Sequence, residues 1–177
     1  MNIFYLSNNP TEAAQMMVDK HVVKMIVETA QLLSTAHRLV DGKEYIEYAA
    51  SGRKIKRWKL DDSRNDILYS ATHITHPSAI WTRESTQNYA WLVNHFFALC
   101  DEYTHRYGKI HSTYLKLSEY IKNPPNNLKK VEFTDPPLAM PDIYKSKIAI
   151  DSYRNYYKFG KSHIHKWTNR PQPIWIN

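Results

Sequence analysis

Glu28 and His21 are the residues whose types and spacing could support catalysis. They lie seven residues apart, so on a helix their side chains fall on one face, two turns from each other. A lone glutamate on an otherwise basic face could stabilise a cation that develops at an anomeric carbon, or orient an attacking nucleophile. The alternative is an ordinary ion pair between Lys24 and Glu28, worth a few tenths of a kcal/mol.

Histidines offer a second kind of chemistry, metal binding. His73 and His76 form an H-x-x-H pair, and one of three nearby aspartates could complete a site: Asp61, Asp62 or Asp66. A metal-dependent hydrolase that uses His73 and His76 is therefore one alternative. None of these carboxylates has the fixed spacing of a known metal motif, and the chain has no glycine-rich phosphate loop, G-x-S-x-G, C-x-x-C or H-E-x-x-H. We therefore expect no metal site and no cofactor.

The 177-residue chain is basic and rich in aromatic residues. Its 24 Lys and Arg against 17 Asp and Glu give a formal net charge of +7, and aromatic residues make up 13%. A positive field attracts polyphosphates, and aromatic rings among the cations offer stacking faces for bases. The composition favours nucleic-acid binding, although a basic surface can also serve only solubility.

Two clusters of cations and aromatic rings are the predicted nucleic-acid contacts. The first surrounds Trp58 and comprises Arg53, Lys54, Lys56, Arg57 and Lys59. The second lies between positions 153 and 170, a segment without acidic residues. Its predicted contacts are Arg154, Tyr156, Tyr157, Lys158, Lys161 and Trp167. Lys20 and Lys24 are expected to add to them. Clusters at opposite ends of the sequence could clamp one ligand, whereas a plain run of like charge is usually a solvated face.

The elements that must position these residues are mainly helices. Residues 2–6 indicate a short strand or extended segment, and Asn9-Pro10 predicts the start of one helix that reaches about residue 40. Its predicted polar side comprises Lys20, His21, Lys24, Glu28, Gln31, Thr35 and Arg38. Further helices are predicted at about 62–72, just after His76-Pro77, from about 89 to 107, at 112–122 and at 143–159. Residues 43–60 alternate as in a small hairpin, and residues 123–142 hold five of the nine prolines and predict a loop.

These features predict a mainly α, compact single-domain helical bundle over residues 1–177, with a short extended N-terminus and a possible small β-hairpin at about 43–60. The one cysteine, Cys100, lies on the apolar face of the strongest helix, so it is expected to be inert, and a lone cysteine suits a reducing compartment. No apolar run is long enough to span a membrane, and the start of the chain does not resemble a secretory leader. We therefore expect a cytoplasmic monomer that does not enter a membrane.

Asp19, His21 and Glu28 form an Asp-x-His with a Glu seven residues after the His, and this motif resembles that of a known family, the phage-type pyrimidine-dimer DNA glycosylases with AP-lyase activity. Those enzymes have a short N-terminal segment, then a helix with Asp-x-His and a catalytic Glu seven residues after that His; the matching positions are Asp19, His21 and Glu28. Bacterial proteins grouped with them share further short patterns. These patterns match Val18, Asp19, Lys24, Val27, Glu28, Gln31, Leu33, His76, Pro77, Trp81, Cys100, Glu102, Arg106, Gly108, Pro136, Pro137, Pro141, Pro173 and Trp175.

The resemblance implies a mechanism and a partner. The N-terminal α-amine would attack the sugar carbon and give an imine, and β-elimination would then nick the strand. An α-amine is less basic than a lysine amine, so more of it is neutral near pH 7. By this resemblance Met1 or Asn2 supplies the amine, Glu28 assists, and His21 contacts the DNA or the sugar. The implied partner is double-stranded DNA with a base flipped out.

The sequence also departs from the family pattern. The family's enzymes expose a Thr amine after removal of the initiator Met, whereas residue 2 here is Asn, before which the initiator Met is usually retained. Val27 stands where those enzymes have a second basic residue beside the catalytic Glu. A protein that binds nucleic acid without catalysis, as a phage or host regulator, is therefore the leading alternative to a glycosylase.

Overall fold

Helices make up most of the structure, and one hairpin is its only sheet. The computed structural model describes all residues 1–177. The α-helices are α1 (Pro10–Met16), α2 (Asp19–Asp41), α3 (Arg64–Ile67), α4 (Pro77–Thr82), α5 (Thr86–Tyr107), α6 (Ser112–Ile121) and α7 (Ala149–Asn155). The strands are β1 (Lys43–Tyr48) and β2 (Lys54–Lys59), and single turns of 3-10 or π-helix cover Asp142–Tyr144, Tyr156–Gly160, Ser162–Ile164 and Ile174–Ile176. The predicted fold class, mainly α with a small hairpin, is confirmed.

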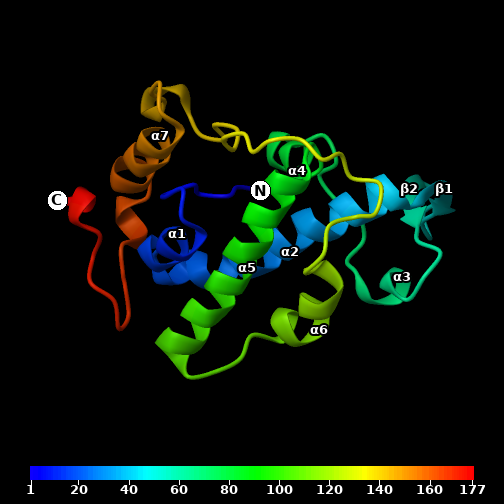
Figure 1. Cartoon of the computed structure of the whole chain (residues 1–177), viewed down its shortest axis with the longest axis horizontal. Coiled ribbons are helices and arrows are strands. Elements are labelled where there is room, and N and C mark those ends of the chain that lie inside the picture. Colours follow the sequence, from blue (N-terminus) through cyan, green and yellow to red (C-terminus); the bar gives the residue numbers. More distant parts are fainter.

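Helices α2 and α5 cross at the centre and supply much of the core (Figure 1). Fully buried side chains of α2, among them Ile26 and Leu33, are part of one apolar cluster with Leu92 and Phe96 of α5. Helix α1 packs against α5, while α4 and α6 pack against α2. None of the helices combines the length and the apolar composition that crossing a membrane requires.

The long N-terminal helix of the prediction is two helices. Asn9 caps α1 as predicted, since its side chain accepts hydrogen bonds from the backbone N–H groups of Thr11 and Glu12. The helix stops after Met16 because the next two residues, Met17 and Val18, are extended. The N–H of Val18 is donated to the hydroxyl of Tyr157, a residue from the other end of the chain. A contact with a residue distant in the sequence therefore accompanies a break in a segment whose local sequence predicts one continuous helix.

The predicted polar side of α2 is exposed only in part. Lys20 and Lys24 are exposed, but Thr35 and Arg38 nearer the end of the helix are buried. The Arg38 guanidinium donates to four backbone carbonyls, those of Trp58, Asn65, Leu68 and Tyr69. Arg38 thereby holds the hairpin and the short helix α3 against the end of α2.

The hairpin predicted at 43–60 is present and projects beyond the end of α2 (Figure 1). Its antiparallel register pairs Tyr45 with Arg57, and Gly52 in the turn has a positive φ of 76° that favours glycine. Every residue of β1 is exposed. The hairpin is therefore an arm that contributes little to the core.

Other predicted elements differ in extent. Residues 2–6 pair with no strand, yet Ile3 to Leu6 are buried. The helix predicted at 62–72 is the four-residue α3, and the one predicted from 143 begins at Ala149. After Asn155 it continues as one π-helical turn, in which a Cβ on Gly160 would come within 2.6 Å of the Tyr156 ring. The loop over 123–141 is irregular, as its prolines predict.

Candidate active site

Glu28 receives the start of the chain. Its Oε2 accepts a hydrogen bond from the backbone N–H of Asn2 at 3.2 Å, and its Oε1 lies 3.2 Å from Nζ of Lys24. The Glu28 side chain is 16% exposed, whereas that of Lys24 is 65% exposed. The predicted ion pair with Lys24 is therefore present, but Lys24 is largely exposed to solvent, and the second carboxylate oxygen accepts the Asn2 N–H. Both predicted roles of Glu28, ion pair and partner of the amine, remain compatible with this geometry.

The Asn2 side chain fixes the path of the N-terminal segment. Its Oδ1 accepts from the N–H groups of Ile3 at 2.7 Å and Phe4 at 3.0 Å, and its Nδ2 donates to the carbonyl of Ala139 at 2.8 Å. Phe4 has a φ of 52°, a left-handed conformation that costs a non-glycine residue about 1–3 kcal/mol. Contacts of the Phe4 ring, stacked on His21 with centroids 4.3 Å apart, offset that cost. The hydrogen bonds of the Asn2 side chain and the packing of the Phe4 ring thus hold the start of the chain against Glu28.

His21 is part of this packing, and its predicted exposure on the polar face is wrong. The ring is buried between Phe4 and Tyr157, and its Nδ1 forms a hydrogen bond of 2.7 Å with the Tyr157 hydroxyl. Burial, helped by the charges of Lys161 and Lys24, lowers the pKa of His21 to about 3. Tyr157 is fully buried as well. His21 and Tyr157 therefore have structural contacts within the protein, and their predicted contacts with DNA or the sugar stay predictions.

Asp19, the first residue of the family-like motif, is also structural. It accepts from Arg106 at 2.9 Å and from the N–H and hydroxyl of Thr168 at 2.9 and 2.8 Å. Arg106 is shared with the buried Glu102, which in turn binds Arg170 at 2.9 Å. Burial by itself would raise the pKa values of Asp19 and Glu102, but these hydrogen bonds and charges lower both. The network ties the C-terminal tail to α2 and α5.

The histidine pair of the metal alternative lies at and just before the start of α4. His76 caps α4, because its Nδ1 accepts the N–H of Ser78 at 3.1 Å. Burial first, and then the charges of the N-terminal amine and His73, lower the pKa of His76, while Glu28 acts in the opposite direction. No group of three or more His, Cys, Asp or Glu side chains in the structure could hold a metal ion, so His73 and His76 lack the predicted third ligand.

The C-terminal cluster is divided between site and scaffold. Tyr156 stacks near Phe4 with centroids 6.2 Å apart, and Nζ of Lys161 lies 4.8 Å from the Tyr156 ring centre, so these two residues border the N-terminal site. Three other predicted DNA contacts donate to backbone carbonyls instead: Arg154 to Leu6, Lys158 to Asn177 and Trp167 to Met16. Each of these three is half-buried, so part of each side chain packs within the protein, and their contact with DNA stays a prediction.

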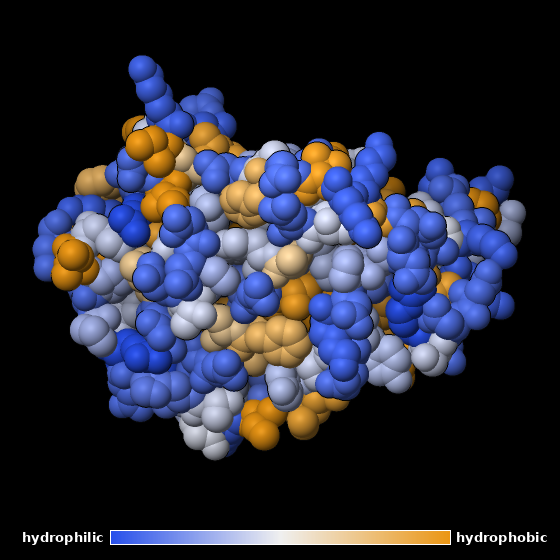
Figure 2. Space-filling view, in the orientation of Figure 1, coloured by the Kyte–Doolittle hydropathy of each residue, from blue (hydrophilic) through white to orange (hydrophobic).

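The basic cluster of the hairpin lies at the other end of α2. Arg53, Lys54 and Lys56 are exposed, and Arg57 is half-buried. Lys56 pairs with Glu44 and Arg57 with Glu47, whereas Arg53 and Lys54 have no acidic partner. The 23 residues of α2 span about 34 Å, with Glu28 between its two ends. On the face seen in Figure 2, hydrophilic residues predominate and the apolar ones form scattered patches. The two clusters therefore flank Glu28 and do not meet at one point.

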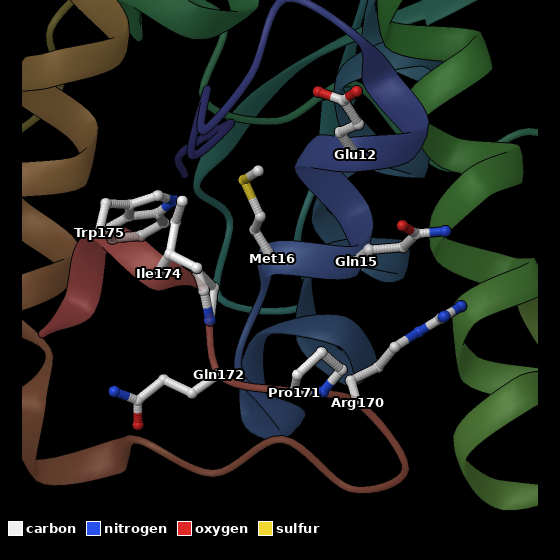
Figure 3. A pocket seen from close by; sticks show the side chains of 9 residues that line it. Glu12, Gln15, Met16, Arg170, Pro171, Gln172, Ile174 and Trp175 are labelled. Carbon is white, nitrogen blue, oxygen red and sulfur yellow. The ribbon is translucent and has the colours of Figure 1, made fainter.

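A separate cavity of about 340 Å³ lies between α1 and the C-terminal tail (Figure 3). Met16, Ile174 and Trp175 give it apolar walls, and Glu12, Gln15 and Arg170 line its polar part. The cavity contains none of the residues that surround the start of the chain. Glu28 and the start of the chain therefore lie together at a different place from this cavity.

The N-terminal two thirds of the chain match a known family. A family model described as pyrimidine dimer DNA glycosylase matches residues 1–115, which include Asn2, Glu28 and His76 and end before α7. No curated protein and no solved structure shows significant similarity to the chain.

Proposed function

Since the chain belongs to the pyrimidine dimer DNA glycosylase family, we propose that it excises a base from duplex DNA and nicks the resulting abasic strand. In this proposal the N-terminal amine is the nucleophile, and Glu28 stabilises the positive charge that develops on the sugar and the imine. Family membership supports a DNA repair glycosylase, and the site geometry supports the assignment of these two groups.

The observation that carries the proposal is the hydrogen bond of 3.2 Å from the Asn2 nitrogen to Glu28. If Met1 is retained, its amine lies one residue before this nitrogen. If Met1 is removed, the Asn2 nitrogen itself is the amine and already lies beside the carboxylate. Either form of the N-terminus therefore offers an amine to Glu28.

The chemistry needs a neutral amine and a nearby anion. The amine attacks C1′, the bond from C1′ to the base breaks, and the sugar ring opens to an imine. A preorganised carboxylate stabilises the cationic character of C1′ and of the imine nitrogen. Loss of a proton from C2′ and departure of the 3′ phosphate then break the strand. Burial of Glu28 to 16% side-chain exposure strengthens its electrostatic effect.

The DNA contacts follow from the length of α2. The C-terminal residues Tyr156 and Lys161 border one end of the site, and the hairpin with Arg53 and Lys54 lies beyond the other end. About 34 Å of helix separates the two regions, which is close to one turn of B-form DNA. A single copy of the chain, as a monomer, would thus contact one turn of duplex with Glu28 near its middle.

Borohydride trapping tests the proposal. The protein is incubated with duplexes that carry an abasic site, a pyrimidine dimer or another damaged base, and the imine is reduced to a stable adduct. We expect an adduct with at least one duplex, at the first residue by mass spectrometry of the cross-linked peptide, which also shows whether Met1 is retained. Acetylation of the α-amine should abolish the adduct, whereas Cys100→Ser and a chelator should leave it unchanged.

The same experiment separates the alternatives. Tight duplex binding without an adduct would identify a protein that binds nucleic acid without catalysis. Cleavage that a chelator stops would support the metal-dependent hydrolase. An adduct on a lysine instead of the first residue would keep the activity and overturn the assigned nucleophile.

A further inference from the structure

We propose that the hairpin of β1 and β2 enters the major groove of the duplex and contacts base edges there with its outer face. The outer face comprises Ile46, Tyr48, Lys54 and Lys56. The inference rests on the proposed function for its partner, duplex DNA. It deepens that function, because it adds contacts with bases in a defined groove to the positive charge that the hairpin supplies.

The hairpin exposes large side chains on an element that has little cover from the rest of the protein. It forms a sheet of only two strands, so both of its edges are free, and every residue of β1 is exposed. Tyr48 is 64% exposed and Ile46 is 44% exposed. A two-stranded hairpin is marginally stable unless something packs against it. An arm with this much exposed apolar and aromatic surface therefore indicates a partner.

The two faces of the hairpin differ in their surroundings. Tyr45, Glu47 and Arg57 line a hollow that the hairpin forms with the body of the protein. Successive side chains on a strand point to opposite faces, so Ile46 and Tyr48 point the other way. The antiparallel register places the two lysines of the outer face directly opposite them. The outer face is therefore turned away from the body of the protein.

The charge of the hairpin selects nucleic acid as its partner. Residues 43–59 contain six Lys and Arg against two Glu, a net charge of +4. A second copy of the chain at the free edge of β1 would bring two such hairpins together, and their like charges would repel each other. A duplex instead presents the opposite charge on its phosphates. Its grooves also offer apolar and hydrogen-bonding atoms to side chains such as Ile46 and Tyr48.

The shape of the hairpin selects the major groove. The major groove is about 12 Å wide and admits a two-stranded ribbon, whereas the minor groove is only about 6 Å wide. A ribbon of two strands about 4.8 Å apart, with bulky side chains on both faces, is too large for the narrower groove. In the major groove Ile46 packs against thymine methyl groups. The Tyr48 hydroxyl and Lys54 reach the hydrogen-bond acceptors of guanine.

The end of α2 sets the distance between these contacts and the lesion. Glu28 and Asp41, the last residue of α2, are 13 residues apart, which corresponds to about 20 Å of helix. The hairpin projects beyond that end (Figure 1), and its six-residue strands add up to about 20 Å. At about 3.4 Å per base pair, the groove contacts should lie roughly 6–12 base pairs from the lesion, on one side only.

Disulfide cross-linking tests the groove and the face. Cys100 is buried, so in Tyr48→Cys the new thiol is the reactive one. The duplexes carry a tetrahydrofuran analogue of the abasic site, which cannot form an imine. They also carry one thiol tether at successive distances from that analogue, either on N4 of cytosine in the major groove or on N2 of guanine in the minor groove. Tyr45→Cys, on the inner face of the same strand, is the matched control. Leu115→Cys, at a 70% exposed position of α6, is the control for exposure alone.

We expect Tyr48→Cys to react about tenfold or more faster with a major-groove tether placed roughly 6–12 base pairs from the analogue than with any minor-groove tether. Both control variants should react slowly with every duplex. Faster reaction with the minor-groove tethers would overturn the groove. Equal rates for Tyr48→Cys and Tyr45→Cys would overturn the outer face as the contacting surface.

The double change Ile46→Ser with Tyr48→Ser gives a second measurement. These side chains carry no charge, so we expect duplex affinity to fall about tenfold while the slope of log affinity against log salt stays the same. Unchanged affinity would overturn the proposal. A wild-type dimer in sedimentation without DNA, converted to monomers by the double change, would assign the face to a second copy and overturn it as well. Borohydride trapping on the wild type keeps the two proposals separate. Cross-linking without an imine adduct would overturn the glycosylase and support the groove contact, whereas an adduct without cross-linking would overturn the groove contact alone.

Discussion

Two carboxylates on α2, nine residues apart, have opposite surroundings. Asp19 accepts three hydrogen bonds, from a buried arginine and from the backbone and side chain of Thr168. Glu28 accepts one backbone N–H and pairs with one exposed lysine. At Asp19 the protein satisfies the charge completely with its own donors, which leaves nothing for a ligand. At Glu28, which is almost as buried, the carboxylate has only one backbone N–H and one exposed lysine as partners, and it lies beside the chain start.

This difference shows that a single sequence motif combines scaffold and site. Asp19 and His21 hold the C-terminal tail and the Phe4 turn in place, and only Glu28 of the three faces the start of the chain. The scaffold residues matter because they fix where the N-terminal segment runs. Substitution of Asp19 should therefore lower mainly the stability of the fold, whereas substitution of Glu28 should lower mainly the rate of the reaction.

The largest expected effect follows from Glu28→Gln. The glutamine can still accept the Asn2 N–H, so the fold should persist, but the charge that stabilises the sugar cation is lost. We expect base excision and imine formation to slow by about two or more orders of magnitude. DNA affinity should stay equal or rise, because a negative charge leaves a surface that faces phosphate. Single-turnover kinetics and binding isotherms on the same duplex measure both quantities.

The matched change at Asp19 sharpens the comparison. Asp19→Asn leaves Arg106 with one carboxylate fewer, so we expect a loss of about 2 kcal/mol in the free energy of unfolding. The rate measured below the unfolding transition should fall far less than in Glu28→Gln. Full activity in Glu28→Gln, or a rate loss in a stable Asp19→Asn as large as in Glu28→Gln, would contradict the division between site and scaffold.

A smaller effect is expected in the pH dependence of stability at the His21 end of the helix. The pKa of folded His21 is about 3, below that of an unfolded histidine, so the unfolded chain binds more protons between those values. The contribution of His21 to the free energy of unfolding is therefore fully present above about pH 6.5, and it falls as the pH decreases from there towards 3. The slope should reach about 1.4 kcal/mol per pH unit for the one proton of His21.

His21→Asn tests this contribution, because its side-chain oxygen can still accept the Tyr157 hydroxyl. Urea unfolding at pH 7, 6, 5 and 4 should show a flatter loss of stability in the variant than in the wild type. His37 and His95, each with a pKa lowered to about 4 by burial, remain in both proteins and supply the shared part of the slope. Identical slopes would mean that His21 is accessible to protons in the folded state.

The sequence predicted the elements better than their contacts. The cap at Asn9, the hairpin and the helix over α5 depend on local residues, and all three are present. The break at Met17 and Val18 depends on Tyr157, which is 139 residues away from Val18, and no local pattern reveals it. His21 looked exposed because α2 was treated as a surface helix, whereas Phe4 and Tyr157 cover it.

The same limit applied to the site. Glu28 could be recognised because a lone acid among cations is unusual in the sequence itself. The role of the Asn2 side chain required knowledge of its partners, and one of them, Ala139, comes from a distant loop. His76 was noticed as half of a metal pair, and only the structure shows it as the cap of α4. The signal available in the sequence was its position directly before Pro77 and Ser78, which indicates the cap of a helix.

The smallest expected effect concerns the hairpin, which should contribute to DNA affinity and not to chemistry. Arg53 and Lys54 have no acidic partner, whereas Lys43 is paired with Asp61 at 2.8 Å and Lys56 with Glu44 at 2.9 Å. A cation that is already neutralised releases few counterions when it meets a phosphate, so the unpaired residues should dominate the salt dependence.

We expect Arg53→Ala with Lys54→Ala to flatten the slope of log affinity against log salt by about two units. The matched pair of changes at Lys43 and Lys56 should flatten it less. At saturating DNA all variants should form the imine at the wild-type rate. If the double change instead slowed the single-turnover rate at saturation, the hairpin would act on the geometry at Glu28, and the separation of binding and chemistry along α2 would fail.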